Sequence, residues 1–175
     1  LLTAEVHSLP TSIAQMTATQ YKINHQQEEY GACTGTPSLH VAVIDPITFE
    51  PWGSAWNGQN PIHNFGNVND GSACRNRVEK YFIFRQNSAQ QLESFQTMIE
   101  DSVPDGHYVL IYTMVAAQYS DWNTYNPSLF QTFQNIGAVN IAHGVGVILN
   151  EGGGDEALVH PVTDQLNILL VALLQ

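Results

Sequence analysis

The sequence predicts an α/β (α+β) fold, in which a mixed β-sheet or a two-sheet sandwich carries two short helices packed on its outside. Three observations predict it. The run LHVAVIDP (39–46) has the β-branched apolar pattern of a central strand. SAQQLESFQTMIEDS (88–102) has apolar residues at helical spacing, and HYVLIYTMV (107–115) is apolar on both faces, like a buried strand. Because helices between strands need connections that cross back onto the sheet, this order favours mixed α and β structure over a plain sandwich.

The elements before the first helix divide into a flank and the start of a compact domain. The flank covers residues 1–37, with an edge strand in LLTAEVH, a second strand at 19–23 and then a polar approach. The compact domain begins at Ser38, and Asp45-Pro46 ends its first strand. The segments that follow are a predicted strand in ITFEPWGSAWNG (47–58), a Gly- and Asn-rich loop (57–77) and a strand in EKYFIF (79–84).

Two helices carry recognisable end signals. Ser88 and Gln91 form a predicted capping box, and Pro104 ends the helix. Its apolar face is made of Leu92, Phe95, Met98 and Ile99. For the second helix the sequence predicts Asn126 as N-cap and Pro127 at the first position. Its predicted buried side and its C-terminal glycine are Leu129, Phe130, Phe133, Ile136 and Gly137.

The C-terminal part contains short apolar runs separated by glycine. AVNIA (138–142) and VGVIL (145–149) are predicted strands that complete a domain over 38–150. The remaining segment, 151–175, is a glycine-rich loop followed by a closing strand in LNILLVALL. Its apolar ending is far shorter than the roughly 18 residues of a membrane-spanning helix, so no membrane insertion is expected.

Composition excludes several classes of partner. The chain has 175 residues, a net charge of −11 and only 12% charged residues, about half the usual share. Its polar surface comes from amides instead, with 14 Asn and 14 Gln. An acidic chain without a basic patch repels phosphate backbones, so neither nucleic acid nor an anionic membrane is an expected partner.

Cysteine use and composition favour an extracellular setting. Cys33 and Cys74 form no C-x-x-C pattern. A disulfide between them would close a loop of about 40 residues and contribute about 4 kcal/mol in the chain-entropy model; two buried free thiols are the alternative. The lysine-poor, amide-rich composition favours the disulfide. A start at LLTAEVH, without an initiator Met, predicts a processed product or a fragment of a larger polypeptide.

The sequence offers little for catalysis or metal binding. Asp105 and His107 flank Gly106 in a helix-to-strand turn, where their side chains are expected to diverge rather than form an acid–base pair. No two His residues share the spacing of a local metal-ligand pair, and no G-x-S-x-G or phosphate loop occurs. We therefore expect no enzyme, no cofactor and no metal, with calcium at Asp70 or at Asp155 and Glu156 as the one alternative.

Aromatic residues beside amides give the best signal of a binding site. They fall at expected strand ends or in loops, and flat aromatic faces beside hydrogen-bonding groups suit sugar rings or a protein partner. Packing of the tryptophans in the core is the competing interpretation. The predicted ligand-binding residues are Trp52, Trp56, Asn57, Tyr119, Asp121, Trp122 and Tyr125.

Three segments resemble a known family. LHVAVIDPITFEPW (39–52), SAQQLESFQTMIEDSVPDGHYVLIYT (88–113) and LFQTFQNIGA (129–138) resemble the ILEI/PANDER (interleukin-like EMT inducer) domain, over about residues 38–150. The first phrase is most similar to the version in large Bacteroidota surface proteins that accompany type IX secretion. The chain departs from the family in VGVILNEGGGDE (145–156), which lacks the usual aromatic residues and lysine, and in having two cysteines only.

The resemblance implies a non-catalytic extracellular module at the bacterial cell surface, which binds a glycan or a protein partner within a larger protein or complex. Carbohydrate binding is implied by the relative in a glycosyltransferase stem. Two alternatives stay open: a purely structural domain of a cell-surface translocation or sortase complex, and an accessory domain of a hydrolase.

Overall fold

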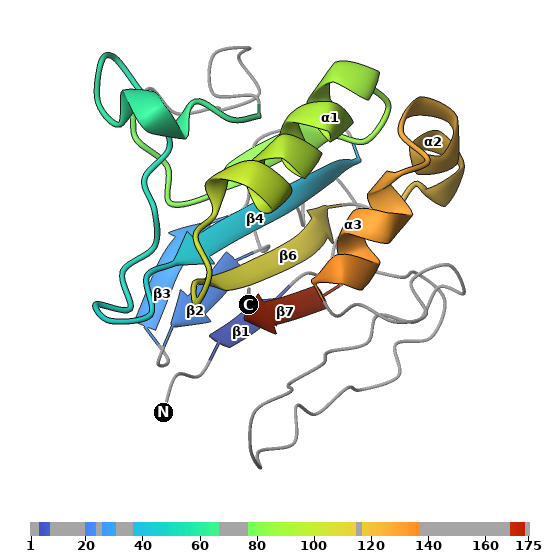
Figure 1. The fold of residues 1–175 in the computed structure, drawn as a ribbon. Coiled ribbons are helices and arrows are strands. Elements are labelled where there is room, and N and C mark those ends of the chain that lie inside the picture. Colours follow the sequence, from blue (N-terminus) through green and yellow to red (C-terminus); the bar gives the residue numbers. More distant parts are fainter. Residues whose placement is uncertain are drawn as a thin grey trace.

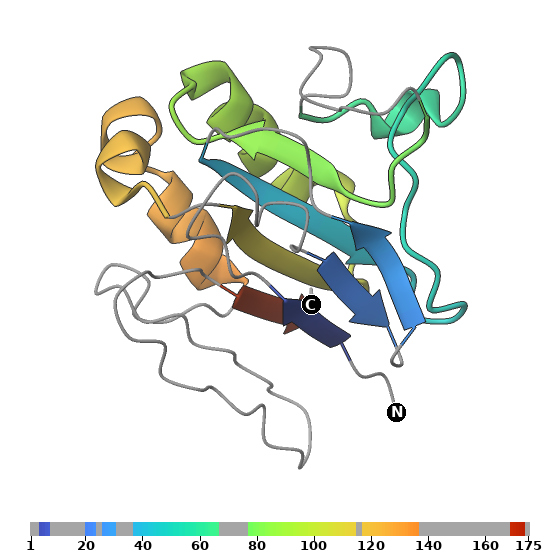
Figure 2. The same ribbon diagram turned by 180° about the vertical axis from the view of Figure 1, so that it is seen from behind.

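A computed structural model gives the fold in Figures 1 and 2. It describes the chain in full at 37–66, 77–113 and 117–136, and as backbone only at 4–7, 20–23, 26–30, 114 and 169–173.

The described strands form two antiparallel sheets, and helices pack beside them. The larger sheet has the order β5-β4-β6-β7, made of β4 (Ser38–Ile44), β5 (Phe82–Arg85), β6 (Tyr108–Met114) and β7 (Leu169–Leu173). The smaller has the order β1-β2-β3, made of β1 (Ala4–His7), β2 (Gln20–Ile23) and β3 (Gln26–Tyr30). Figures 1 and 2 show the helices on one side of the larger sheet and the smaller sheet on the other. The α+β class is therefore confirmed.

A crossover helix links two strands that are not neighbours. β5 and β6 are both antiparallel to β4 and lie on either side of it, so they run in the same direction. The chain between them forms α1 (Ala89–Thr97) and a π-helical turn, η3 (Met98–Ser102), which cross the sheet in front of β4 (Figure 1). The predicted crossover thus exists, whereas all described neighbouring strands are antiparallel.

The core lies between the larger sheet and the helices. Alternate residues of β4, β5 and β6 form its sheet layer, and α1, η3, α2 (Tyr119–Tyr125) and α3 (Leu129–Asn135) form its helix layer. Its sheet residues are Leu39, Val41, Val43, Phe82, Phe84, Val109 and Ile111, and its helix residues include Leu92, Phe95, Met98, Trp122, Leu129 and Phe133.

The opposite face of the larger sheet is also buried, and it is more polar. His40 is fully buried on β4, with its ring stacked on Tyr81 (centroids 5.3 Å apart) and tilted against Tyr112 (5.0 Å). Ser38 Oγ lies 3.1 Å from His40 Nε2. Burial lowers the pKa of His40 to about 3, so this imidazole is neutral in the folded protein at physiological pH.

The first predicted helix begins as expected. The Ser88 side chain accepts a hydrogen bond from Gln91 N (3.4 Å). Gln91 Oε1 is buried and has no partner among the described residues, so only the Ser88 half of the predicted capping box is formed. The turn before β6 also forms as expected, with Gly106 at φ 84° and His107 N bonded to Pro104 O (3.3 Å).

The second predicted helix is replaced by two helices. α2 (Tyr119–Tyr125) was not predicted, and α3 (Leu129–Asn135) begins after Ser128. The prediction of Asn126 as N-cap is wrong: its backbone N–H ends α2 by bonding to Trp122 O (2.8 Å), and its side chain donates to Gln96 Oε1 (3.0 Å). Leu129 and Phe133 are buried in α3 as predicted, while Phe130 and Ile136 are partly buried.

Two other predictions fail. Residues 47–58 form no strand, only isolated bridges at Pro51 and Trp56, since Phe49 and Asn57 adopt positive φ. The segment 26–30, expected to be a polar approach, is strand β3, paired with β2. The strands predicted at 138–142 and 145–149 and the loop from 151 lie outside the described residues. The closing strand is confirmed as β7, which pairs with β6 in the same sheet as β4.

Candidate functional site

The loop between β4 and β5 contains a tight turn that presents Trp56 and Asn57. Trp56 and Gln59 exchange two backbone hydrogen bonds (Trp56 N to Gln59 O, 3.1 Å; Gln59 N to Trp56 O, 2.8 Å). Asn57 and Gly58 between them have φ 45° and 82°. These are the residue types that a two-residue turn with two positive φ angles requires.

Long-range hydrogen bonds hold this loop in place. Ser54 is bonded twice to Glu79, through Ser54 N to Glu79 O (2.8 Å) and Glu79 N to Ser54 Oγ (3.0 Å). Ala55 N donates to His63 O (3.1 Å), and His63 Nδ1 lies 3.0 Å from Gly53 O. The turn at Trp56 is therefore fixed by bonds within the connection between β4 and β5, including bonds to Glu79 shortly before β5.

A shallow depression of about 210 Å³ lies beside this turn. Trp56 supplies a partly exposed aromatic surface, and amide side chains surround it. The sequence predicted Trp56 and Asn57 as site residues, and the structure brings them together here. The residues that line the depression are Ala55, Trp56, Asn57, Gly58, Gln59, Pro61 and Asn64. The Asn- and Gly-rich composition of 57–66 was the available signal for the others.

Trp52 has a different environment. It packs against the hydrophobic core, and its indole stacks on the His63 ring (centroids 4.2 Å apart, planes at 8°). The His107 ring meets its edge at 5.5 Å. Trp52 therefore fits the competing interpretation of core packing, whereas Trp56 lines the depression.

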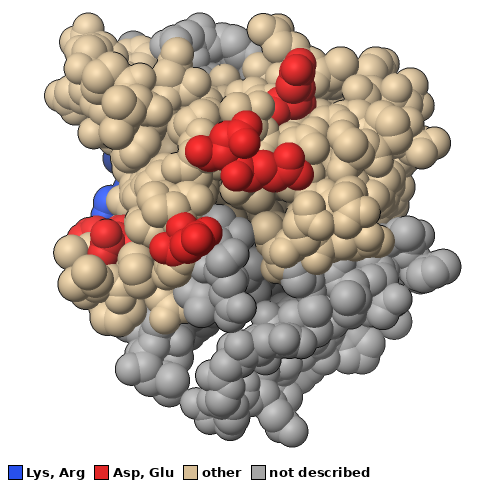
Figure 3. Space-filling model, viewed as in Figure 1, with Lys and Arg blue, Asp and Glu red and all other residues tan. Residues whose placement is uncertain are grey.

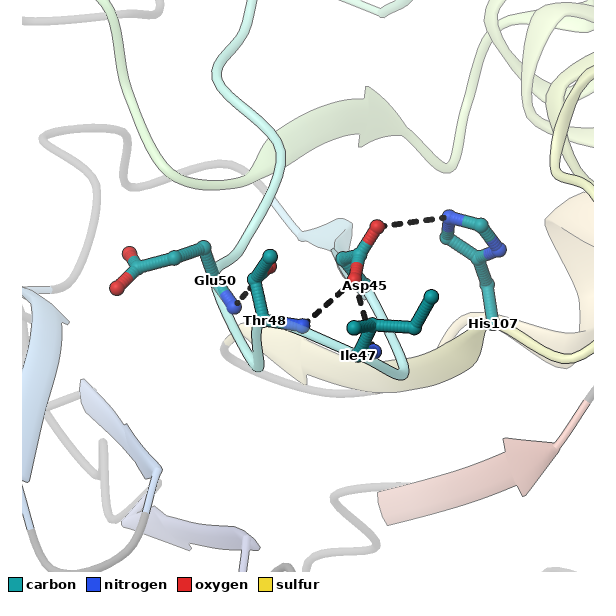
Figure 4. Close-up of polar contacts among 5 residues, drawn as sticks. All are labelled: Asp45, Ile47, Thr48, Glu50 and His107. Atoms are coloured by element: carbon teal, nitrogen blue, oxygen red, sulfur yellow. Dashed lines mark hydrogen bonds and ion pairs between the residues drawn. The ribbon is translucent and has the colours of Figure 1, made fainter.

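His107 faces Asp45 rather than Asp105. His107 Nε2 lies 4.0 Å from Asp45 Oδ2 (Figure 4), because Tyr108 of β6 pairs with Ile44 of β4 and places the two flanking residues side by side. Asp45 Oδ1 accepts hydrogen bonds from Ile47 N and Thr48 N, both at 2.8 Å. The backbone N–H of Thr48, then that of Ile47, lower the pKa of Asp45, and His107 adds a smaller effect. Asp45 thus mainly holds a turn.

The predicted residues of α2 lie apart from the depression. Figures 1 and 2 place α2 and the loop around η2 (Pro61–His63) at opposite sides of the molecule. Trp122 lies within α2, so the prediction that it lies at a strand end or in a loop is wrong. It is fully buried, and its Nε1 donates to Gln86 Oε1 (2.8 Å).

The other aromatic and acidic residues of α2 vary in exposure. Tyr119 and Asp121 are partly exposed, and Tyr125 is 43% exposed. Burial raises the pKa of Tyr119, whose hydroxyl has no hydrogen-bond partner within the described part of the chain. These side chains do not meet Trp52, Trp56 or Asn57 at one site.

Charge is distributed unevenly over the surface. Figure 3 shows acidic side chains over the helix face, around α1, and an uncharged lobe at the upper left, where Figure 1 shows η2. Residues 51–66 contain no Asp, Glu, Lys or Arg. The depression therefore lies on a neutral patch of an acidic molecule.

Several predicted features lie outside the described residues. These are Cys33 and Cys74 and the calcium candidates Asp70, Asp155 and Glu156. Within the described ranges, no three His, Cys, Asp or Glu side chains come together as a metal site, and no helix is both long and apolar enough to cross a membrane.

Comparisons with models of protein families, with curated proteins and with solved structures give no match, so the ILEI/PANDER resemblance stays a prediction from the sequence.

Proposed function

We propose that this chain is a non-catalytic binding module that holds a glycan in the depression beside Trp56. The observation that carries the proposal is the lining itself, in which one partly exposed indole is surrounded by amide side chains. An aromatic face stacks on the apolar face of a sugar ring, and amides both donate to and accept from its hydroxyls.

The size and support of the depression agree with this role. Small-molecule pockets usually have roughly 300–1,000 Å³, so a depression of about 210 Å³ suits one ring of a longer chain laid across the surface. The loop is held by its bonds to Glu79 and within itself, so a ligand would meet a preformed site.

The non-catalytic part of the proposal is supported by the environment of the His–carboxylate pair. Asp45 is committed to two backbone N–H groups of its own turn, and its other oxygen is 4.0 Å from His107. This arrangement fits a structural link between two strand ends. On sequence resemblance alone, we also propose that the module works outside the cell, in a large bacterial surface or type IX secretion-associated protein.

A protein partner is the second candidate, favoured by one specific observation. The turn after β4 exposes Ile47 (85%) and Phe49 (36%), and Phe49 adopts φ 60°, which is costly for a bulky residue. Strain of this kind gathers at functional sites, so this turn is a candidate protein contact.

A glycan array probed with the purified 175-residue chain tests the proposal. We expect binding to a subset of glycans and, for Trp56→Ala, at least about tenfold weaker binding, which corresponds to about 1.4 kcal/mol. Tyr125→Ala is the matched control, because it removes another exposed aromatic residue far from the depression. An array without binding, or equal affinity of Trp56→Ala and the parent chain, would refute glycan binding at this site. The structural-domain and protein-contact alternatives would then be favoured.

A further inference from the structure

We infer that the depression beside Trp56 selects neutral, hydroxyl-rich sugars and rejects glycans that carry carboxylate or sulfate groups. This inference rests on the proposed function, and it specifies the class of ligand that the same site takes.

Among the described residues that line the depression, none has a charged side chain. Its polar side chains are the amides of Asn57, Gln59 and Asn64, and Trp56, Ala55, Gly58 and Pro61 complete it. A hydroxyl donates one hydrogen bond and accepts others, and an amide offers both functions in return. A carboxylate or sulfate only accepts, so it could bond to the amide N–H groups of the lining but would leave the amide carbonyl oxygens without a donor.

Arg77, the first described Lys or Arg after the depression in the sequence, is paired with a carboxylate. Its Nη2 lies 3.3 Å from Glu79 Oε2. Glu79 is buried and is bonded through its backbone to Ser54 at the base of the same loop. The guanidinium is thus paired with the carboxylate of Glu79, shortly before β5, and does not line the depression.

The surrounding field also disfavours anions. The segment 51–66 is uncharged, but the turn that precedes it carries Asp45 and the exposed Glu50, and the whole chain has a net charge of −11. An anionic glycan would approach an acidic molecule without gaining an ion pair. Like-charge contacts of this kind cost affinity and slow association.

A neutral site has a second measurable property. Because no charge of the lining would contribute to binding, affinity should be nearly independent of ionic strength. A site that used cations for anionic sugars would weaken as salt is added. Salt dependence therefore separates the two kinds of recognition without knowledge of the particular sugar.

The test compares matched pairs of oligosaccharides that differ only in a sialic acid, uronic acid or sulfate group, titrated against the purified chain. We expect the neutral member to bind at least about tenfold more tightly than the anionic member. Its affinity should change by less than about twofold between about 0.05 M and about 0.5 M salt. Gln59→Lys adds a cation to the lining and should reduce the ratio of affinities for the neutral over the anionic oligosaccharide. Gln59→Glu adds an anion and should increase this ratio. Both variants keep the backbone hydrogen bonds of the turn.

The outcomes test the class of sugar separately from glycan binding itself. Tighter binding of the anionic members, weakened by salt, would overturn the neutral-sugar inference and leave glycan binding intact. Absence of binding to every member, neutral or anionic, would overturn the proposed function and this inference with it. An unchanged preference in both Gln59 variants would place recognition away from the depression.

Discussion

At the scale of single residues, His40 links the polar face of the sheet to the pH dependence of stability. Its pKa is lowered from 6.5 to about 3 by burial, so the unfolded chain binds a proton more readily than the folded one. The stability that depends on neutral His40 is complete above about pH 6.5 and is lost as the pH falls towards 3.

We therefore predict that neutral His40 makes the free energy of unfolding fall by about 1.4 kcal/mol between about pH 7.5 and about pH 5.5. Urea unfolding of the parent chain and of His40→Phe at both pH values measures it. The phenyl ring keeps the aromatic packing between Tyr81 and Tyr112, and the other histidines contribute equally to both chains. Identical pH dependence in the two chains would contradict the predicted burial of a neutral imidazole.

At the scale of elements, α2 is held by tertiary contacts rather than by its own sequence. Its residues YSDWNTY have low helix propensity. Gln86 Oε1 accepts from both Gln118 N (2.7 Å) and Trp122 Nε1, and the indole is buried against Phe133 and Phe130. One buried glutamine thus fixes the start of the helix and its central side chain together.

Two substitutions on this helix should separate core from surface. We predict that Trp122→Ala lowers the free energy of unfolding by about 3–5 kcal/mol, since it leaves a large cavity and removes a donor from Gln86. Tyr125→Ala, three residues further on and 43% exposed, should cost less than about 1 kcal/mol. Urea denaturation gives both values. Equal losses, or a small loss for Trp122→Ala, would mean that the indole is not a core residue.

The same helix shows why only part of the fold and site could be predicted. β4, α1 and β6 carry local signals, namely apolar runs, a Ser88 cap and a Pro104 stop. α2 depends on Gln86, more than thirty residues earlier in the chain. β3 consists mainly of polar residues, which gave no strand pattern, and it is held by its backbone pairing with β2. In the site, the Gly- and Asn-rich composition of 57–77 predicted a loop, but the strand predicted over 47–58 missed the turn at Asn57 and Gly58. The Asp45–His107 contact could have been found only from the pairing of Ile44 with Tyr108.

At the scale of the whole molecule, the larger sheet is built from segments far apart in the chain. β4 is central, with β5 and β6 beside it, and β7 closes the sheet on the outer side of β6. Strands on both sides of residue 151, the boundary predicted from the sequence, therefore belong to one sheet. β6 is buried from Val109 to Thr113, so its outer edge needs a partner strand.

We predict that a chain truncated before Leu169 loses cooperative unfolding and aggregates, because it exposes the hydrogen-bonding edge of β6 from Tyr108 to Tyr112. Removal of residues 1–7 is the matched control. It deletes β1, which pairs with β2 at the edge of the smaller sheet and leaves every strand pair of the larger sheet in place. Size-exclusion chromatography and urea unfolding should show a monomeric, cooperative chain only for the N-terminal truncation. Cooperative unfolding of the C-terminally truncated chain and aggregation of the N-terminally truncated chain would mean that β7 is dispensable and that the smaller sheet is needed for the fold.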